Sequence, residues 1–189
     1  MHGTSALTPG TGLQIRTAHP SEYAAISALT VDVYVGDGYV SPEDDYVNEL
    51  GDVAHRATEA EVLVAVHDDE IAGSLTVAKP GTRYAEIARP GELEFRMLAV
   101  AKRARGLGAG TALVRAVIDE ARAGGYEAVA LTTMATMVDA HRIYERLGFV
   151  AVPERNWSPH EGLQLYVMRL TLAKAMTCHC KTVATIPAR

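Results

Sequence analysis

With 189 residues, 48% of them hydrophobic, the chain can build one well-covered core and is too short for two. Its formal charge of −5 and sequence pI near 5.8 argue against nucleic acid and anionic membranes as partners, because both usually demand clustered lysine and arginine. With two cysteines, no secretory leader and no apolar stretch of the roughly 20 residues that span a membrane, it is expected to be a soluble cytoplasmic protein.

The N-terminal half carries helix and hairpin signals. Residues 1–12 are rich in Gly, Pro, Ser and Thr, which predicts a flexible leader. Pro20 opens one helix, and Pro42 follows the N-cap hydroxyl of Ser41 and precedes two first-turn carboxylates. Asp68-Asp69-Glu70 separates two β-branched runs, which is typical of a hairpin. The elements expected here are a strand over 13–17, helices over 20–36 and 41–58, and strands over 61–67 and 71–78.

In the C-terminal half the hydrophobic period changes from two to 3.6 after Val100, and Gly124 and Gly148 mark helix ends. The order strand, helix, strand predicts a right-handed crossover after the antiparallel hairpins. The elements expected here are strands over 93–100, 128–132, 149–152 and 163–170 and helices over 108–123 and 138–147. Residues 13–172 would then form one α/β domain, with a mixed sheet of about seven strands and about four helices, and residues 173–189 a tail.

The most informative segment is a glycine-rich turn, Arg105 to Gly110, at the start of a helix. Glycines there let backbone N–H groups approach an anion, and the helix dipole adds favourable partial charge, so a pyrophosphate is the natural occupant. Lys102, Arg103 and Arg105 supply cations. A Walker-type loop is disfavoured because no lysine stands between Gly110 and Thr111, and a dinucleotide fingerprint needs different glycine spacing. The remaining alternative is a glycine-rich loop that only reverses the chain direction and binds no ligand.

This turn resembles the Arg/Gln-x-x-Gly-x-Gly/Ala motif of the GNAT acetyltransferase superfamily, which lies between a Leu-x-Val strand and its helix. The superfamily's second motif, a Tyr four residues before a Gly-Phe pair, is matched by Tyr144, Gly148 and Phe149. The resemblance spans about residues 13–170. It implies the GNAT fold, with acetyl-CoA in a V-shaped cleft between the fourth and fifth strands. Members often carry Asn where this chain has Met137, so that one contact to the pantetheine departs from the pattern.

The resemblance also assigns roles to residues. The backbones of Leu98 and Val100 would pair with the pantetheine arm, the Leu98 N–H would stabilise the oxyanion, and Tyr144 would protonate the departing sulfur. A Tyr144 that only packs in its helix is the bland alternative. The residues that would contact acetyl-CoA are Leu98, Ala99, Val100, Arg103, Arg105, Gly106, Leu107, Gly108, Ala109, Gly110, Thr111 and Tyr144.

Glu94 is the candidate base that deprotonates the amine, because some family members place a catalytic glutamate on this strand. By simple alternation Glu94, Arg96 and Leu98 share one strand face, and Phe95 and Met97 the other, unless a bulge intervenes. A structural ion pair between Glu94 and Arg96 is an equally supported alternative.

The acceptor side is less clearly marked. Tyr34 and Tyr39, assigned to the connection between the first two helices, and Trp157, before the last strand, are candidate contacts. We expect a small-molecule primary amine as acceptor. Acetylation of a protein lysine or N-terminus, helped by the acidic run over 43–45, and a non-catalytic acyl-CoA sensor are the alternatives. Cys178-His179-Cys180 is too tight for usual zinc spacing, so no metal is expected, and an isologous homodimer is the prior for assembly.

Overall fold

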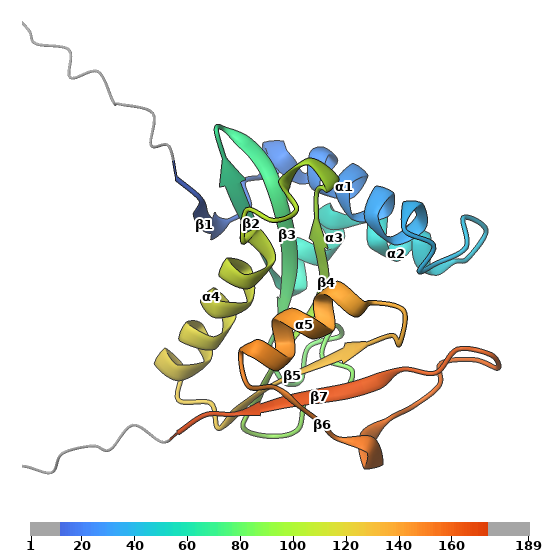
Figure 1. The fold of residues 1–189 in the computed structure, drawn as a ribbon, viewed down its shortest axis with the longest axis vertical. Helices are drawn as coiled ribbons and strands as arrows, with labels where there is room; N and C mark the ends of the chain where they lie inside the picture. Colours follow the sequence, from blue (N-terminus) through green and yellow to red (C-terminus); the bar gives the residue numbers. More distant parts are fainter. Residues whose placement is uncertain (1–11, 174–189) are drawn as a thin grey trace, which may run out of the picture.

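A seven-stranded sheet in the order β1-β2-β3-β4-β5-β7-β6 forms the centre of the molecule in the computed structural model, which describes residues 12–173 (Figure 1). Neighbouring strands are antiparallel except β4 and β5, which run parallel. The strands are β1 (Gln14–Thr17), β2 (Glu61–His67), β3 (Glu70–Ala78), β4 (Glu92–Val100), β5 (Ala128–Thr133), β6 (Val150–Ala151) and β7 (Tyr166–Thr171). The mixed sheet predicted from the sequence is confirmed.

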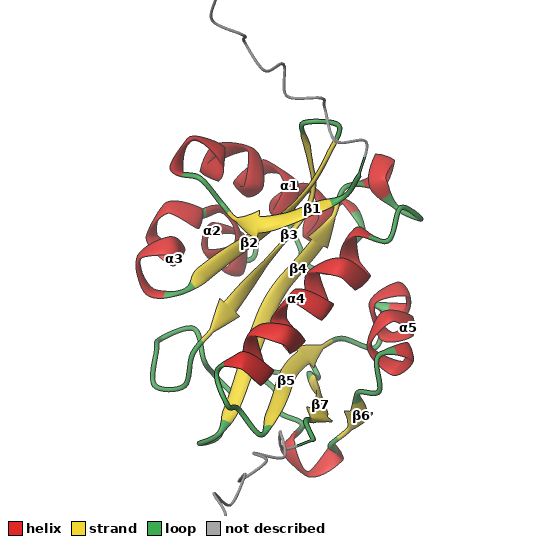
Figure 2. Ribbon diagram, turned by 90° about the vertical axis from the view of Figure 1, so that its left-hand side faces the viewer, coloured by secondary structure: helices red, strands yellow, loops and turns green. Residues whose placement is uncertain are grey.

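Helices cover both faces of the sheet (Figure 2). One layer holds three helices that contact β2, β3 and β4, and the other holds α4, which packs across the sheet centre, with α5 beside it. Within residues 12–173 the α-helices are α1 (Tyr23–Gly36), α2 (Tyr46–Gly51), α3 (Val53–Glu59), α4 (Ala109–Ala123) and α5 (Val138–Arg146), and short 3-10 turns lie at Pro20–Glu22, Lys102–Ala104 and Pro153–Arg155. The apolar stripe predicted for α4 is buried against the sheet.

The single helix predicted over 41–58 is wrong, because the chain forms two shorter helices there. The Ser41 hydroxyl donates to the Glu43 carboxylate, and the Asp44 carboxylate accepts from the Tyr46 N–H. The predicted capping residues therefore form a turn, and the helix begins only at Tyr46. Asp52 ends α2 and caps α3 by accepting from His55. The last strand also begins later than predicted, at Tyr166.

The hairpin between β2 and β3 turns in two residues, because Glu70 already pairs with His67. Asp68 and Asp69 both have left-handed backbone angles, with φ of 50° and 61°. Such a pair matches the right-handed twist of the flanking strands, and Asp tolerates it better than most residues.

β4 parts from β5 beside a bulge that β4 forms opposite β3. The two strands pair only from Glu92 to Phe95, opposite 128–131, and β4 then continues along β3 alone. Thr76 faces Arg96 while Ser74 faces Ala99, so β4 carries one extra residue, and Met97 has a φ of 54°. Neighbouring strands that part in this way leave a V-shaped opening between them.

The bulge also reverses the side-chain alternation expected for β4. Met97 packs with Val33 and Tyr34 of α1, whereas Leu98 and Val100 pack against the cluster beneath α4. Simple alternation, which pairs Met97 with Phe95, therefore fails from this point onward.

The buried carboxylate of Glu92, at the start of β4, binds two arginines from the C-terminal part of the domain. Glu92 accepts hydrogen bonds from Arg155 (2.9 and 3.1 Å), Arg169 (2.6 Å) and the Arg89 N–H (3.1 Å). Burial raises the pKa of Glu92, but the hydrogen bonds from the two arginines outweigh burial and leave the pKa below its usual value. The side chains of Glu92 and Arg155 are each 6% exposed, so solvent screens this pair little.

We expect Glu92→Ala to lower the free energy of unfolding by about 3–5 kcal/mol, because Arg155 would stay buried without its partner. Urea denaturation near neutral pH measures the loss. The loss should shrink as the pH falls below the usual glutamate pKa and through the lowered pKa of Glu92, because the stability that comes from the lowered pKa is complete only above the usual value. The exposed Glu145→Ala is the control, expected within about 0.5 kcal/mol of wild type. Equal losses in the two variants would contradict the assignment.

Candidate active site

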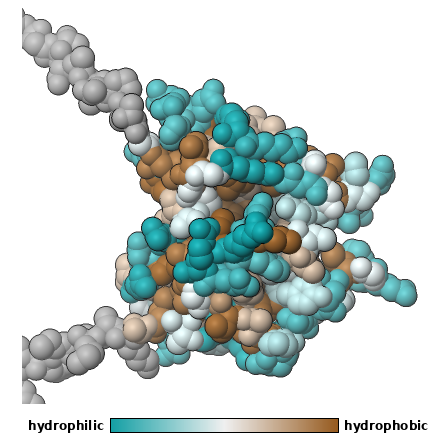
Figure 3. All heavy atoms as spheres, viewed as in Figure 1, coloured by the Kyte–Doolittle hydropathy of each residue, from teal (hydrophilic) through white to brown (hydrophobic). Residues whose placement is uncertain are grey.

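A cavity of about 470 Å³ opens where β4 and β5 separate, a size typical of small-molecule sites. The space-filling view shows the outline notched between the lobe that carries α1 and α2 and the lobe that carries β7 (Figure 3). Both helical layers contribute to its lining. The sequence-predicted residues that line it are Tyr34, Tyr39, Leu98, Val100, Arg105, Gly106, Gly108, Ala109, Gly110, Thr111 and Tyr144.

The glycine turn has the features of an anion cradle. Gly106 and Gly108 have φ of +87° and +84°, and a Cβ at either would meet nothing within 4 Å, so both face open space. Because α4 begins at Ala109, the N–H groups of its first turn have no partner within the helix. These donors and the positive end of the helix dipole fit a pyrophosphate.

Gly110 has a different reason to be glycine. A Cβ there would lie 2.9 Å from Cδ1 of Ile143 and 3.3 Å from Cγ2 of Val100, both of which line the same cavity. The missing side chain therefore lets the start of α4 approach α5 and β4 closely. This close approach fixes the turn against the two other walls of the cavity.

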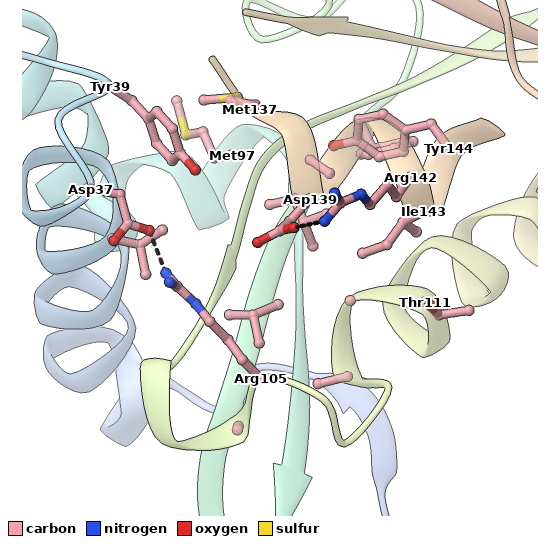
Figure 4. A pocket seen from close by; sticks show the side chains of 18 of the residues that line it. Asp37, Tyr39, Met97, Arg105, Thr111, Met137, Asp139, Arg142, Ile143 and Tyr144 are labelled. Atoms are coloured by element: carbon pink, nitrogen blue, oxygen red, sulfur yellow. Dashed lines mark hydrogen bonds and ion pairs between the residues drawn. The ribbon is translucent and has the colours of Figure 1, made fainter. Parts of the chain in front are cut away.

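The basic residues of the turn diverge. Arg105 reaches across the cavity and pairs with Asp37, which follows α1 (Figure 4), and Lys102 lies 3.9 Å from the same carboxylate. Arg103 points elsewhere, pairing with Glu70 at 2.8 Å and donating to the Ile71 carbonyl. Of the three cations, only Arg105 lines the cavity.

Two further predicted cofactor contacts stand outside the lining. Ala99 is 1% exposed and packs in the cluster beneath α1, because the bulge turns it to that face. Leu107 projects outward and is 50% exposed. With Arg103, they stay sequence predictions without support from the cavity geometry.

Tyr144 lines the cavity from α5, is 4% exposed and belongs to an aromatic cluster. Its ring centroid is 5.8 Å from that of Phe95 and 5.9 Å from that of Phe149. Gly148, with φ of +91°, ends α5 and lets the Phe149 N–H reach the Tyr144 carbonyl, which explains the spacing of the second motif. Burial raises the pKa of Tyr144 well above its usual value, so the phenol keeps its proton near neutral pH.

Glu94 lies beneath the cavity and does not line it. Its side chain is fully buried, and Oε2 accepts from the N–H groups of Ile87 and Ala88, each at 2.9 Å, while Oε1 has no hydrogen-bond partner among residues 12–173. Burial raises the pKa of Glu94, and the two backbone hydrogen bonds oppose that shift only in part. The alternative pairing with Arg96 is not what forms, because Arg96 pairs with Glu86 at 3.0 Å and Glu49 at 3.8 Å.

The acceptor candidates divide between two hollows. Tyr34 lies within α1, contrary to its predicted place in a connection, and its ring contacts that of Tyr39 edge-on at 6.1 Å. Trp157 lines a separate hollow of about 550 Å³ with Glu86 and Arg89. The structure therefore brings the two tyrosines to the main cavity and places Trp157 outside it.

Sequence analysis missed several lining residues. Asp139, Arg142 and Ile143 share the helical stripe of α5 that faces the cavity, and Arg142 pairs with Asp139 at 2.8 Å (Figure 4). Their i, i+3 and i+4 spacing was a usable signal. Thr132 and Met97 gave no such signal, because their placement depends on strand register.

The metal and membrane predictions concern features that can be searched for in the described residues. Over residues 12–173 no three His, Cys, Asp or Glu side chains gather as a metal site, and no helix has the length and apolarity needed to cross a membrane. The motif Cys178-His179-Cys180 lies outside the described residues.

The model of the acetyltransferase (GNAT) family matches residues 24–149. The chain belongs to this family. Membership confirms the resemblance seen in the sequence, and with it acetyl-CoA as the cosubstrate that GNAT acetyltransferases use. The glycine turn, with its open left-handed glycines at a helix start, fits the pyrophosphate of that molecule.

Solved structures support the fold. A GNAT acetyltransferase from Staphylococcus aureus Mu50 is 14% identical, with a TM-score of 0.68 over 86% of this chain and 100% of that one. A Salmonella typhimurium acetyltransferase, solved with its cofactor acetyl-CoA, is 22% identical, with a TM-score of 0.62 over 87% and 96%. The N-acetylaspartate synthetase of Danio rerio is 44% identical over 62 residues, which are 33% of this chain and 22% of that protein.

We expect Gly108→Ala to weaken acetyl-CoA binding at least about tenfold, because the methyl group would enter the cradle and disturb donors to a charged group. Gly81→Ala is the matched control, since Gly81 has nearly the same φ (+85°) and equally open space, outside the cavity. Both variants should lose about 1–2 kcal/mol of stability from the left-handed backbone. Calorimetric titration that finds equal affinities in both would refute the anion site.

Proposed function

We propose that the protein is a cytoplasmic N-acetyltransferase that moves the acetyl group of acetyl-CoA to a primary amine of a small molecule by direct attack. The observation that carries the proposal is one cavity in which the glycine turn, the parted strand β4 and Tyr144 meet. Anion binding, backbone pairing and a proton donor are what thioester aminolysis needs in one place.

Leu98 supplies the backbone groups of the proposed reaction centre. It follows the bulge at Met97 and lines the cavity where β4 has lost its β5 partner. Backbone groups along such a free edge can pair with an extended ligand, as in strand addition. In the proposed role the Leu98 N–H donates to the acetyl oxygen as negative charge develops on it.

Two side chains handle the protons. The amine nitrogen forms the new N–C bond as the C–S bond breaks, Glu94 takes the proton that the amine loses, through a water, and Tyr144 gives its proton to the departing sulfur. Both groups then exchange protons with solvent, so amine and acetyl-CoA become amide and CoA. The free Oε1 of Glu94 and the protonated phenol of Tyr144 support these roles.

A small acceptor is favoured over a protein by the walls of the cavity. Tyr34, Tyr39 and Arg96 contribute large side chains to its lining, which limits the room for a peptide segment. The acidic run that could attract a basic peptide is partly occupied, since the Asp44 carboxylate accepts a hydrogen bond from the Tyr46 N–H. The name of the N-acetylaspartate synthetase also points to a small amine acceptor in that relative.

The first test is thermal unfolding with acetyl-CoA, CoA, ATP and NAD at equal concentration, because a ligand at 100 times its Kd adds about 2.7 kcal/mol. Stabilisation by acetyl-CoA and CoA alone supports the cosubstrate. A panel of amino acids, polyamines, aminoglycosides and lysine peptides, followed by thiol release, then identifies the acceptor class. Binding of acetyl-CoA without release for any amine would leave the sensor alternative standing.

We expect Tyr144→Phe to lower kcat about 100-fold, the low end of general acid catalysis, because the phenol proton is lost. The ring contacts with Phe95 and Phe149 persist, so Tm should stay within about 2 °C of wild type. Steady-state thiol release measures the rate. An unchanged kcat would show that Tyr144 only packs.

We expect wild-type kcat/KM to fall as the pH drops through the raised pKa of Glu94, because a base must be ionised to accept a proton. Glu94→Gln keeps an oxygen for the N–H groups of Ile87 and Ala88 and removes the titration, so its profile should be lower and flatter between about pH 5 and 9. Melting curves check that the variant stays folded. Overlapping profiles would remove Glu94 from the mechanism.

A further inference from the structure

Thr132 has a buried hydroxyl that the proposed mechanism leaves unused. Among the side chains of residues 12–173, four buried polar atoms lack a hydrogen-bond partner: Nε of Arg56, Oε1 of Glu94, Oγ1 of Thr132 and Nε1 of Trp157. Of these four residues, only Thr132 lines the cavity between β4 and β5. An unpaired buried hydroxyl costs free energy. Because this hydroxyl stands in a cavity wall, a ligand atom can supply the missing hydrogen bond.

The register of the sheet fixes which face Thr132 occupies. Its neighbours Leu131 and Thr133 belong to the α4 and α5 side: Leu131 packs in the cluster beneath α4, and the Thr133 hydroxyl donates to Sδ of Met137 and lies 3.1 Å from Nε2 of His141. Because side chains alternate along a strand, Thr132 faces the opposite side. That side is the one on which Glu94 and Arg96 stand.

Thr132 is also the first residue of β5 beyond the point where the strands part, since the last pair across β4 and β5 joins Phe95 and Leu131. The hydroxyl therefore stands at the base of the opening. The glycine turn and Tyr144 approach from the α4 and α5 side, whereas Tyr34 and Arg96 approach from the α1 side. A ligand atom next to Thr132 would therefore lie on the α1 side of the sheet, opposite the glycine turn and Tyr144.

We propose that the Thr132 hydroxyl positions the acceptor amine by accepting a hydrogen bond from its N–H, an inference that rests on the proposed function. A hydroxyl oxygen offers two lone pairs for such a bond and takes no proton. Thr132 thus holds the amine nitrogen while the lone pair of that nitrogen attacks the thioester carbonyl. Glu94 remains the group that removes the proton. This role requires an acceptor whose nitrogen still carries an N–H when the amine is neutral, as a primary amine does.

The test compares Thr132→Val, which keeps the shape and removes the hydroxyl, with Thr132→Ser, which restores it. Using the amine with the fastest thiol release, we expect Thr132→Val to lower kcat/KM for the amine about three- to tenfold, through a higher amine KM, with the KM of acetyl-CoA within about twofold of wild type. Thr132→Ser should recover most of the loss. The Tm of Thr132→Val should equal or exceed that of wild type, because no internal bond is lost.

Thr133→Val is the matched control for stability, since it removes a hydroxyl with partners and should lower Tm. A comparable fall of Tm in Thr132→Val, unchanged amine kinetics, or a rise in the KM of acetyl-CoA equal to that for the amine would each overturn the inference and leave the proposed function intact. Acetyl-CoA binding with no amine acetylated by wild type would instead overturn both.

Discussion

The parting of β4 from β5 after four paired residues is the constraint on which the rest of the site depends. Parallel neighbours ordinarily stay paired, because each unpaired backbone group that is buried loses free energy. Here β4 continues along β3 past the extra residue at Met97 while β5 follows β7, so one edge of β4 has no strand partner in the middle of the sheet. That placement makes the backbone itself available for ligand binding, with a hydrophobic core on either side of it.

The glycine turn, the start of α4 and Tyr144 then reach the opening through local contacts. The glycine turn lies between the end of β4 at Val100 and the start of α4 at Ala109, so it stands at the edge of the cavity. Gly110 lets α4 and α5 approach closely, and Gly148 folds Phe149 back onto Tyr144. The glycines thus act at separate points of the same assembly, one pair facing open space and the others permitting contact between elements.

Local sequence signals sufficed for most elements and for the glycine turn, because turn residues and hydrophobic periodicity act over a few positions. They failed where distant chain segments decide. The helix over 41–58 breaks at Asp52, and the bulge at Met97 moved Leu98 and Ala99 to faces that alternation does not give. The partners of Glu94 lie in a loop six and seven residues away, and the position of Thr132 depends on sheet register, so composition and spacing could predict neither environment.

The connection between β3 and β4 is fastened through its main chain. Glu94 binds the N–H groups of Ile87 and Ala88, Glu92 binds that of Arg89, and Arg155 donates to the Ile87 carbonyl. None of these bonds involves a side chain of residues 87–89, so the identity of those side chains is uncoupled from the loop's position. The segment beside the second hollow can therefore change in sequence while its backbone stays attached to β4, which is the property a specificity loop needs.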